Sequence, residues 1–152
     1  MVDDSKLHDF LRELLQRGGS DLLLVHGVAA SIRKNGEVEK IGDIPLDGSD
    51  IESLVQPVLT PTGMAQYRAT QIADCSYRIP DLGRFRINLH HERGHAAATI
   101  RALPVKVPSL GELGLPVEVG HLASLRRGLV LIGGAAGAGK STTLAADRKS
   151  VV

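Results

Sequence analysis

The chain has 152 residues, a formal net charge of +1, and 43% hydrophobic against 23% charged residues. These proportions are typical of a globular protein, and with 3% aromatic residues its core must be mainly aliphatic. The small net charge argues against a general polyanion binder, so we expect no nucleic-acid partner.

The sequence also favours a cytoplasmic location. Cys75 is the single cysteine, so no disulfide can form within the chain, as is usual in a reducing compartment. The acidic start, residues 1–4, lacks the apolar region of a secretory signal. No apolar run approaches the roughly 20 residues that a membrane helix needs, so we expect no transmembrane segment.

The first third of the chain predicts a helix, a strand and a hairpin, in that order. An amphipathic helix ending at Gly18-Gly19 is indicated by apolar residues at helical spacing, namely Leu7, Phe10, Leu11, Leu14 and Leu15. The apolar run 22–25 predicts a short strand. Asn35-Gly36 favours positive φ at both central turn positions, so strands at 30–33 and 38–41 are expected to form a hairpin.

Two helices and a three-stranded meander are expected next. Ser49 with Glu52 has the spacing of a capping box, and Thr60-Pro61 offers a cap and a first-turn proline. From residue 74 to 101 apolar and polar residues alternate, which predicts antiparallel strands with one face in water. The apolar series is Cys75, Tyr77, Ile79, Phe85, Ile87, Leu89, Ala96, Ala98 and Ile100.

The pattern changes after residue 103. Prolines and glycines between residues 104 and 116 indicate a linker, and the run 128–132 is uniformly apolar. Such a run is typical of a parallel strand buried on both faces. The sequence therefore predicts an α+β domain followed by the first strand of an α/β domain.

Residues 134–141 fit the phosphate-loop pattern G-x-x-x-x-G-K-[ST]. Glycines let the backbone N–H groups approach phosphate oxygens, and a helix starting at the loop points its positive end at the anion. Lys140 is expected to contact the β- and γ-phosphates of ATP, and the Ser141 hydroxyl to bind Mg²⁺. The predicted nucleotide-binding residues are Gly134, Ala135, Ala136, Gly137, Ala138, Gly139, Lys140, Ser141 and Thr142.

Five further segments, taken together with their order and spacing, carry a resemblance to a known family. They are GSDL at 19–22, GRFRIN at 83–88, IRALP at 100–104, LGELGLP at 110–116, and RGLVLI at 127–132 followed by GKSTTLA at 139–145. With these segments the chain resembles the type II/IV secretion ATPase superfamily, and most of all the twitching-motility (PilT-type) ATPases of type IV pilus retraction.

The resemblance implies a PAS-like N-terminal domain at 1–103, a linker at 104–116, and the start of a RecA-like ATPase domain at 117–146. It also implies a homo-hexamer that binds ATP in the cytoplasm, peripheral to the inner membrane, on a platform protein of a pilus or secretion system. Family members reach nucleotide with arginines of the first domain, which makes Arg84, Arg86 and Arg101 candidates. The alternative is that these arginines only form part of a solvent-exposed face of the sheet.

The chain departs from the family pattern at two places. Leu23 stands where the family often has His, and Ala135-Ala136 stand where it often has Pro-Thr. Because backbone amides hold the phosphates, the alanines are compatible with binding but alter the stiffness of the loop.

Hydrolysis needs groups that the family places after the phosphate loop, namely acidic motifs, a second nucleotide motif and a His motif. The 10 residues after Thr142 contain none of these. We therefore expect an ATP-binding fragment of a motor ATPase that is inactive alone, and enzyme activity of the chain is left open. The alternatives are a non-enzymatic N-terminal assembly module with a vestigial nucleotide loop, or an unrelated P-loop kinase or transporter ATPase. The sequence does not decide whether the intact protein is a retraction motor, an accessory paralogue or a secretion ATPase.

Residues 147–152 match nothing in the family pattern. One reading frame of a common sequencing adapter encodes the same hexapeptide, so we expect a non-native tail. Re-sequencing across codon 147 tests this expectation.

Two other groups of residues have alternative readings. His90, His91 and His95 lie near one hairpin and suggest a metal site, but His90 and His91 point to opposite strand faces, which favours a solvated hairpin tip. Cys75 lies on the apolar side of its strand and is interpreted as a small core residue rather than a nucleophile.

We expect residues 1–103 to fold and residues 117–152 to be poorly ordered, because a lone apolar strand at 129–132 has no neighbouring strands. Amide hydrogen exchange of the monomer should therefore be slow in the meander and fast at residues 130–132. Strong protection of residues 130–132 in the monomer would contradict this expectation.

Overall fold

The structure is a computed structural model that describes residues 5–104, 108–125, 127–135 and 138–150. The chain divides into two compact units, Met1–Leu103 and Pro104–Val152, and each is described by itself. None of the described helices is both long and apolar enough to cross a membrane.

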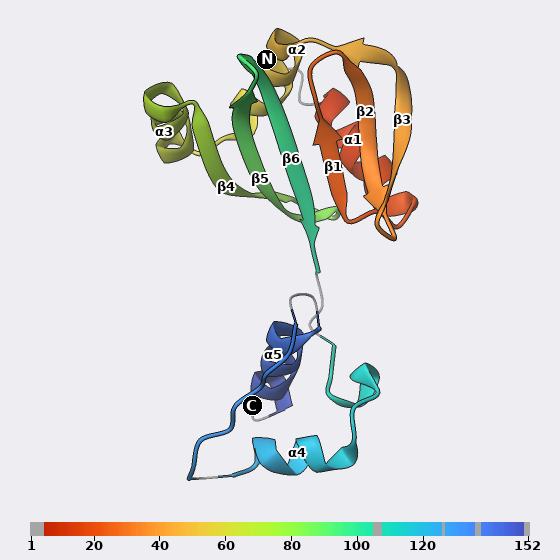
Figure 1. Ribbon diagram of the computed structural model, residues 1–152, viewed down its shortest axis with the longest axis vertical. Coiled ribbons are helices and arrows are strands. Elements are labelled where there is room, and N and C mark those ends of the chain that lie inside the picture. The colour runs from red at the N-terminus through yellow and green to blue at the C-terminus, as the bar shows by residue number, and fades with distance from the viewer. Residues whose placement is uncertain (1–4, 105–107, 126, 136–137, 151–152) are drawn as a thin grey trace. The chain divides into compact units, whose positions relative to one another are not determined.

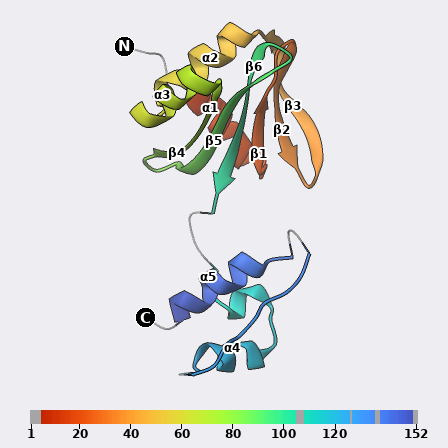
Figure 2. The ribbon, with the colours of Figure 1, turned by 60° about the vertical axis from the view of Figure 1, so that its left-hand side comes forward.

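The first unit is a six-stranded antiparallel sheet with helices packed on one face (Figures 1 and 2). The strand order is β3-β2-β1-β6-β5-β4, so β1 pairs with β6 and joins strands from both ends of the unit. The elements are α1 Ser5–Gln16, β1 Asp21–Leu24, β2 Val28–Lys34, β3 Glu37–Leu46, α2 Gly48–Val55, the 3₁₀ helix η1 Gln56–Val58, α3 Pro61–Thr70, β4 Ile72–Ile79, β5 Gly83–Glu92 and β6 His95–Leu103.

The core of this unit lies between the sheet and its helices. Alternate residues of the strands face the helices, and the largest fully buried side chains include Leu7, Leu11, Leu14, Ile51, Phe85, Ile87 and Ile100. The core is mainly aliphatic, as the composition predicts, and the alternation predicted for the meander is confirmed. The opposite face of the sheet, which we call the outer face, carries mostly polar and charged side chains.

The predicted hairpin turn is confirmed by its backbone conformation. Asn35 and Gly36 have φ values of 51° and 88°, which is the left-handed region expected at both positions of this turn. The strands on either side are longer than predicted because β3 continues past the hairpin as an edge strand of the sheet. The cap of α3 is also as predicted, since the Thr60 hydroxyl accepts a hydrogen bond from the backbone N–H of Gly63.

The predicted capping box at Ser49 and Glu52 is wrong. The N-cap of α2 is Asp47, whose carboxylate accepts from the backbone N–H of Asp50, while the Asp50 carboxylate accepts from the N–H of Asp47. Ser49 lies inside the helix and donates its hydroxyl to the Asp47 carboxylate. The helix therefore begins two residues earlier than Ser49 predicts, because an aspartate cap is available directly after β3.

The second unit contains short helices and an extended segment. Its helices are η2 Gly111–Leu113, α4 Val117–Ala123 and α5 Lys140–Ser150, and the last confirms the predicted helix after the loop. The predicted strand at 128–132 is not formed, because no other described segment pairs with it. The side chains of Leu129 and Leu131 are accordingly 83% and 82% exposed.

The capping correction gives a stability prediction. Asp47→Ala removes the hydrogen bond to the N–H of Asp50 and should lower the free energy of unfolding more than Ser49→Ala does. Ser49→Ala removes only a bond to the capping carboxylate and should cost less than about 0.5 kcal/mol. Urea titrations of both variants measure the difference, and an equal or larger loss for Ser49→Ala would restore Ser49 as the cap.

Candidate functional site

The candidate phosphate loop joins the extended segment to α5. Gly139 has a φ of 88°, which favours glycine, and a Cβ added at Gly134 would lie 3.4 Å from the Cβ of Ala138. Two of the predicted binding residues, Ala136 and Gly137, lie outside the described residues. The described part of the loop thus uses glycine where the backbone turns into the helix.

The ammonium group of Lys140 is held across the loop. It donates hydrogen bonds to the carbonyl oxygens of Gly134 at 2.8 Å and Ala135 at 2.6 Å. An ammonium group has three donors, and the described residues of the loop accept from two of them. Lys140 is therefore positioned by its own loop, and its third N–H has no acceptor among the described residues.

The first turn of α5 supplies further donors. The N–H groups of Lys140, Ser141 and Thr142 belong to this turn, where no intrahelical acceptor exists. Thr143 bonds back to the carbonyl of Gly139 through its N–H at 2.9 Å and its hydroxyl at 3.1 Å, which fixes the start of the helix. The exposed hydroxyl of Ser141 lies beside these groups. Backbone donors, an ammonium and a hydroxyl are the groups that phosphate with Mg²⁺ requires, so the residues fit this ligand.

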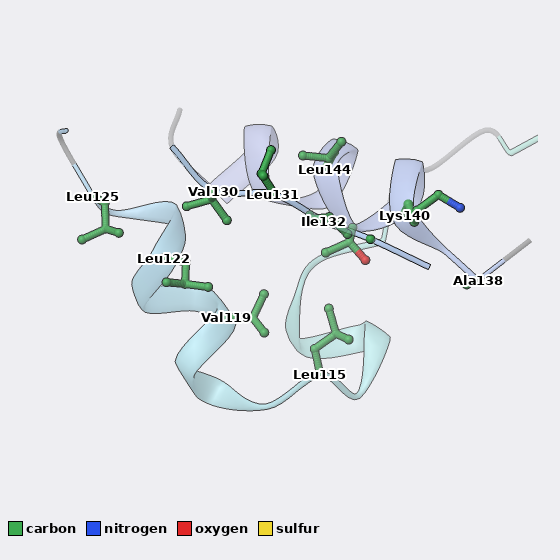
Figure 3. Close-up of a pocket in the computed structure, with 12 residues that line it drawn as sticks. Leu115, Val119, Leu122, Leu125, Val130, Leu131, Ile132, Ala138, Lys140 and Leu144 are labelled. Atoms are coloured by element: carbon green, nitrogen blue, oxygen red, sulfur yellow. The ribbon is translucent and has the colours of Figure 1, made fainter. Parts of the chain in front are cut away.

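An apolar cavity of about 570 Å³ adjoins the loop (Figure 3). Its walls come from α4, the extended segment and α5, and are formed by Leu115, Val119, Leu122, Leu125, Val130, Leu131, Ile132, Gly133, Ala138, Lys140, Thr143 and Leu144. In Figure 3 the ammonium of Lys140 points away from the leucine side chains. The cavity is therefore a gap in apolar packing and not the phosphate-binding surface itself.

The three candidate arginines lie on the outer face of the sheet, and two of them are already paired. Arg86 donates from Nε and Nη2 to the Asp74 carboxylate, with a shortest distance of 2.7 Å. Arg101 donates from Nε to Asp21 at 2.8 Å. Arg84 lies opposite Arg78 in the β4–β5 register and has no ion pair with any described residue.

Asp21 is the most buried charged residue of the outer face, with a side chain that is 5% exposed. Burial acts to raise its pKa, but hydrogen bonds from Ser20 and Arg101 and the charges of Arg101 and Arg33 outweigh it, so that the pKa is held below its usual value. The Asp21 carboxylate therefore stays ionised and depends on Arg101.

The histidines of the β5–β6 hairpin, for which the sequence favours a solvated tip over a metal site, make separate contacts in the structure. His95 stacks on His26 with ring centroids 3.7 Å apart, whereas His91 lies 3.4 Å from the hydroxyl of Tyr67. No set of three or more metal-ligating side chains occurs among residues 5–150 as far as they are described. No sequence pattern signals either contact, because the partners are far apart in the chain.

Tyr67 and Cys75 show how burial changes side-chain acidity. The Tyr67 hydroxyl donates to Glu52 at 2.6 Å, and burial together with this carboxylate raises the pKa of Tyr67. Burial also raises the pKa of the Cys75 thiol. A raised pKa disfavours the thiolate, which agrees with a core role for Cys75 and not with a nucleophile.

Comparison with known proteins identifies the relatives of the chain. No family model matches it. It is 34% identical over 131 residues to the type IV pilus retraction ATPase PilT of Pseudomonas aeruginosa, covering 86% of this chain and 38% of PilT. The chain belongs to the PilT-type ATPase family. PilU, a type IV pilus ATPase of the same organism, is 33% identical over 136 residues, which is 90% of this chain and 36% of PilU.

Solved structures agree with this assignment. The pilus retraction motor PilT with bound ADP superposes with a TM-score of 0.83 at 30% identity, over 94% of this chain and 42% of that chain. DotB of Legionella pneumophila, an ATPase, gives a TM-score of 0.72 at 25% identity, over 98% and 42%. The chain thus spans well under half the length of the relatives it matches, and its sheet with helices fits their N-terminal domain.

The Asp21–Arg101 pair predicts a pH-dependent stability difference. Arg101→Ala leaves a buried carboxylate without its main partner and should lower the free energy of unfolding at neutral pH by about 1–2 kcal/mol, since the 62% exposed Arg101 is partly screened. A depressed folded-state pKa contributes stability above the unfolded value of about 3.9 and loses it as the pH falls through the folded value.

The gap between wild type and Arg101→Ala should therefore close as the pH falls below about 4, as measured by urea unfolding at several pH values. Arg84→Ala is the matched control, because Arg84 has no ion pair with described residues, and it should change stability by less than about 0.5 kcal/mol. A gap that is unchanged in acid would show that the ion pair is not its cause.

Proposed function

We propose that this chain binds Mg²⁺·ATP through residues 134–141 as the nucleotide-binding part of a motor ATPase for type IV pilus retraction or a related secretion system. The observation that carries the proposal is the Lys140 ammonium, positioned by the carbonyls of Gly134 and Ala135 at the start of α5. The relationship to PilT, whose solved structure contains ADP, supports the choice of nucleotide.

Each group of the loop has a role in this proposal. The N–H groups at the start of α5 bind phosphate oxygens, and Lys140 directs its remaining donor at the β- and γ-phosphates. The Ser141 hydroxyl is a ligand of Mg²⁺, which when bound neutralises phosphate charge. Binding at this loop needs no side chain of residues 135–136, so the two alanines are compatible with it.

The wider assembly is part of the same proposal. By relationship, residues 1–103 act as a PAS-like domain, 104–116 as a linker and 117–146 as the start of a RecA-like domain, with residues 147–152 a non-native tail. A homo-hexamer in the cytoplasm, docked on an inner-membrane platform protein, is the expected setting. A nucleotide contact from Arg84, Arg86 or Arg101 stays a prediction, and Arg84 is the one whose guanidinium has no ion pair with described residues.

Nucleotide binding tests the proposal directly. A fluorescent ADP analogue with Mg²⁺ should bind the chain, and Lys140→Ala should weaken binding about 10- to 100-fold, since a hydrogen bond to a charged group is lost. Lys6→Ala is the control, because Lys6 is exposed on α1, and it should leave the affinity unchanged. Equal affinity of the wild type and Lys140→Ala would refute the site.

Turnover separates the proposal from its alternatives. We expect bound ATP not to be hydrolysed by this chain alone, because no carboxylate for Mg²⁺ or water-positioning group is found in its loop. Turnover that disappears in Lys140→Ala would contradict this expectation. Absence of any nucleotide binding would instead favour the non-enzymatic assembly module.

A further inference from the structure

Two arginines lie opposite each other where β4 and β5 meet at their turn (Figure 1). Arg78 is the direct partner of Arg84 in the register of these antiparallel strands. Their chain neighbours Tyr77 and Phe85 pack into the core, so both arginines belong to the outer face, where they are exposed. Opposite side chains of neighbouring strands have Cβ atoms about 5 Å apart, and like charges in such a pair destabilise a sheet.

The nearby arginines of the outer face are arranged differently, because each has a carboxylate partner. Arg86 pairs with Asp74 at 2.7 Å, and Arg101 pairs with Asp21 at 2.8 Å. In both cases the aspartate lies on a neighbouring strand. This part of the face is therefore built from cross-strand pairs of opposite charge, and the Arg78–Arg84 pair departs from that arrangement.

The described residues supply no counter-ion for this pair. Neither Arg78 nor Arg84 forms an ion pair with a described residue. On its other side Arg84 is opposite Leu103 of β6, whose side chain accepts no hydrogen bond. Asp81 lies in the turn, midway between the arginines in sequence, and is not paired with either of them. Two exposed guanidinium groups thus repel each other without compensation from the described chain.

The chemistry of two guanidinium groups indicates the kind of ligand that would remove this repulsion. Each guanidinium presents a planar fork of N–H donors that matches a pair of oxygens on one anion. Two forks on adjacent strands can hold the same group from both sides, and their charges match a doubly charged anion. A phosphate dianion has this charge and enough oxygens for both forks, whereas a carboxylate has one charge and only two oxygens.

We propose that Arg78 and Arg84 form a binding site for a phosphate dianion, separate from the phosphate loop. The required group is a phosphate with free terminal oxygens, which inorganic phosphate or the last phosphate of a nucleotide supplies. Both arginines belong to the first unit and Lys140 belongs to the second, so the two sites share no residue. The inference goes beyond the proposed function, which gives Arg78 no role and does not depend on this site.

Chemical-shift titration of the full chain with inorganic phosphate, at an ionic strength held constant with chloride, tests the site. The amide signals of residues 78 and 84 should shift saturably, and these shifts should persist in Lys140→Ala, which lacks the ammonium of the loop. Arg78→Gln and Arg84→Gln should each weaken this binding about 10-fold, because hydrogen bonds to a charged group are lost. Arg68→Gln, which removes an exposed arginine of α3, is the matched control and should bind phosphate like the wild type.

A charge reversal distinguishes an anion site from loss of structure. Arg78→Glu places a carboxylate opposite Arg84, so without phosphate its melting temperature should be higher than that of the wild type. The same variant should show no phosphate-dependent shift at residue 84. In the Lys140→Ala background phosphate should raise the melting temperature, because it binds the folded state, and adding Arg78→Glu should remove this increase.

Titration of Lys140→Ala with ADP in the absence of Mg²⁺ identifies the source of the phosphate group. Shifts at residues 78 and 84 that saturate at lower ADP than phosphate concentration support the site with a nucleotide as its ligand. Equal or weaker binding of ADP supports it with free phosphate as the ligand. Shifts that do not saturate, that are as large with adenosine, or that survive unchanged in both glutamine variants overturn the proposal, as does a complete absence of shifts at these two residues.

Discussion

Helices cover only one face of the six-stranded sheet, and this one-sided burial determines how the first unit is built. Every strand must place its apolar residues on the helix side, which the alternation from Cys75 to Ile100 achieves. The outer face then collects the charged residues that cannot be buried. Those charges must be compatible with one another across the strands, since neighbouring side chains lie about 5 Å apart.

The ion pairs of the outer face follow from this constraint. Asp21 is almost completely buried in spite of its charge, and Arg101 on the neighbouring strand compensates it. Asp74 and Arg86 form a second ion pair across β4 and β5, but both of these side chains are exposed. Two of the arginines that the family resemblance assigns to nucleotide therefore stabilise the sheet itself. An anion that binds Arg86 or Arg101 would have to share the guanidinium with its aspartate or displace that aspartate. Arg84 has no ion pair with a described residue, so no aspartate competes there.

Local chemistry determined which features could be predicted from the sequence. Asn35-Gly36 and Thr60-Pro61 specify their turn and cap with residues that are adjacent in the chain, and both predictions are confirmed. Asp47, Ser49 and Asp50 are all suitable caps, and the choice depends on where β3 ends, which the pattern does not fix. The Asp21–Arg101 pair joins residues 80 positions apart, so only the strand order reveals it.

The strand predicted at 128–132 shows the limit of composition. An apolar run indicates that burial of the segment is favourable. A β-strand also needs a neighbouring strand to pair with its backbone, and the described residues provide none. The helix after the loop needs no such partner, because its hydrogen bonds are internal, and α5 forms as predicted. Gly134, whose carbonyl holds Lys140, follows the unpaired segment directly. The position of the loop in the described chain therefore depends on the hydrogen bonds of Lys140 to the carbonyls of Gly134 and Ala135 and on the start of α5.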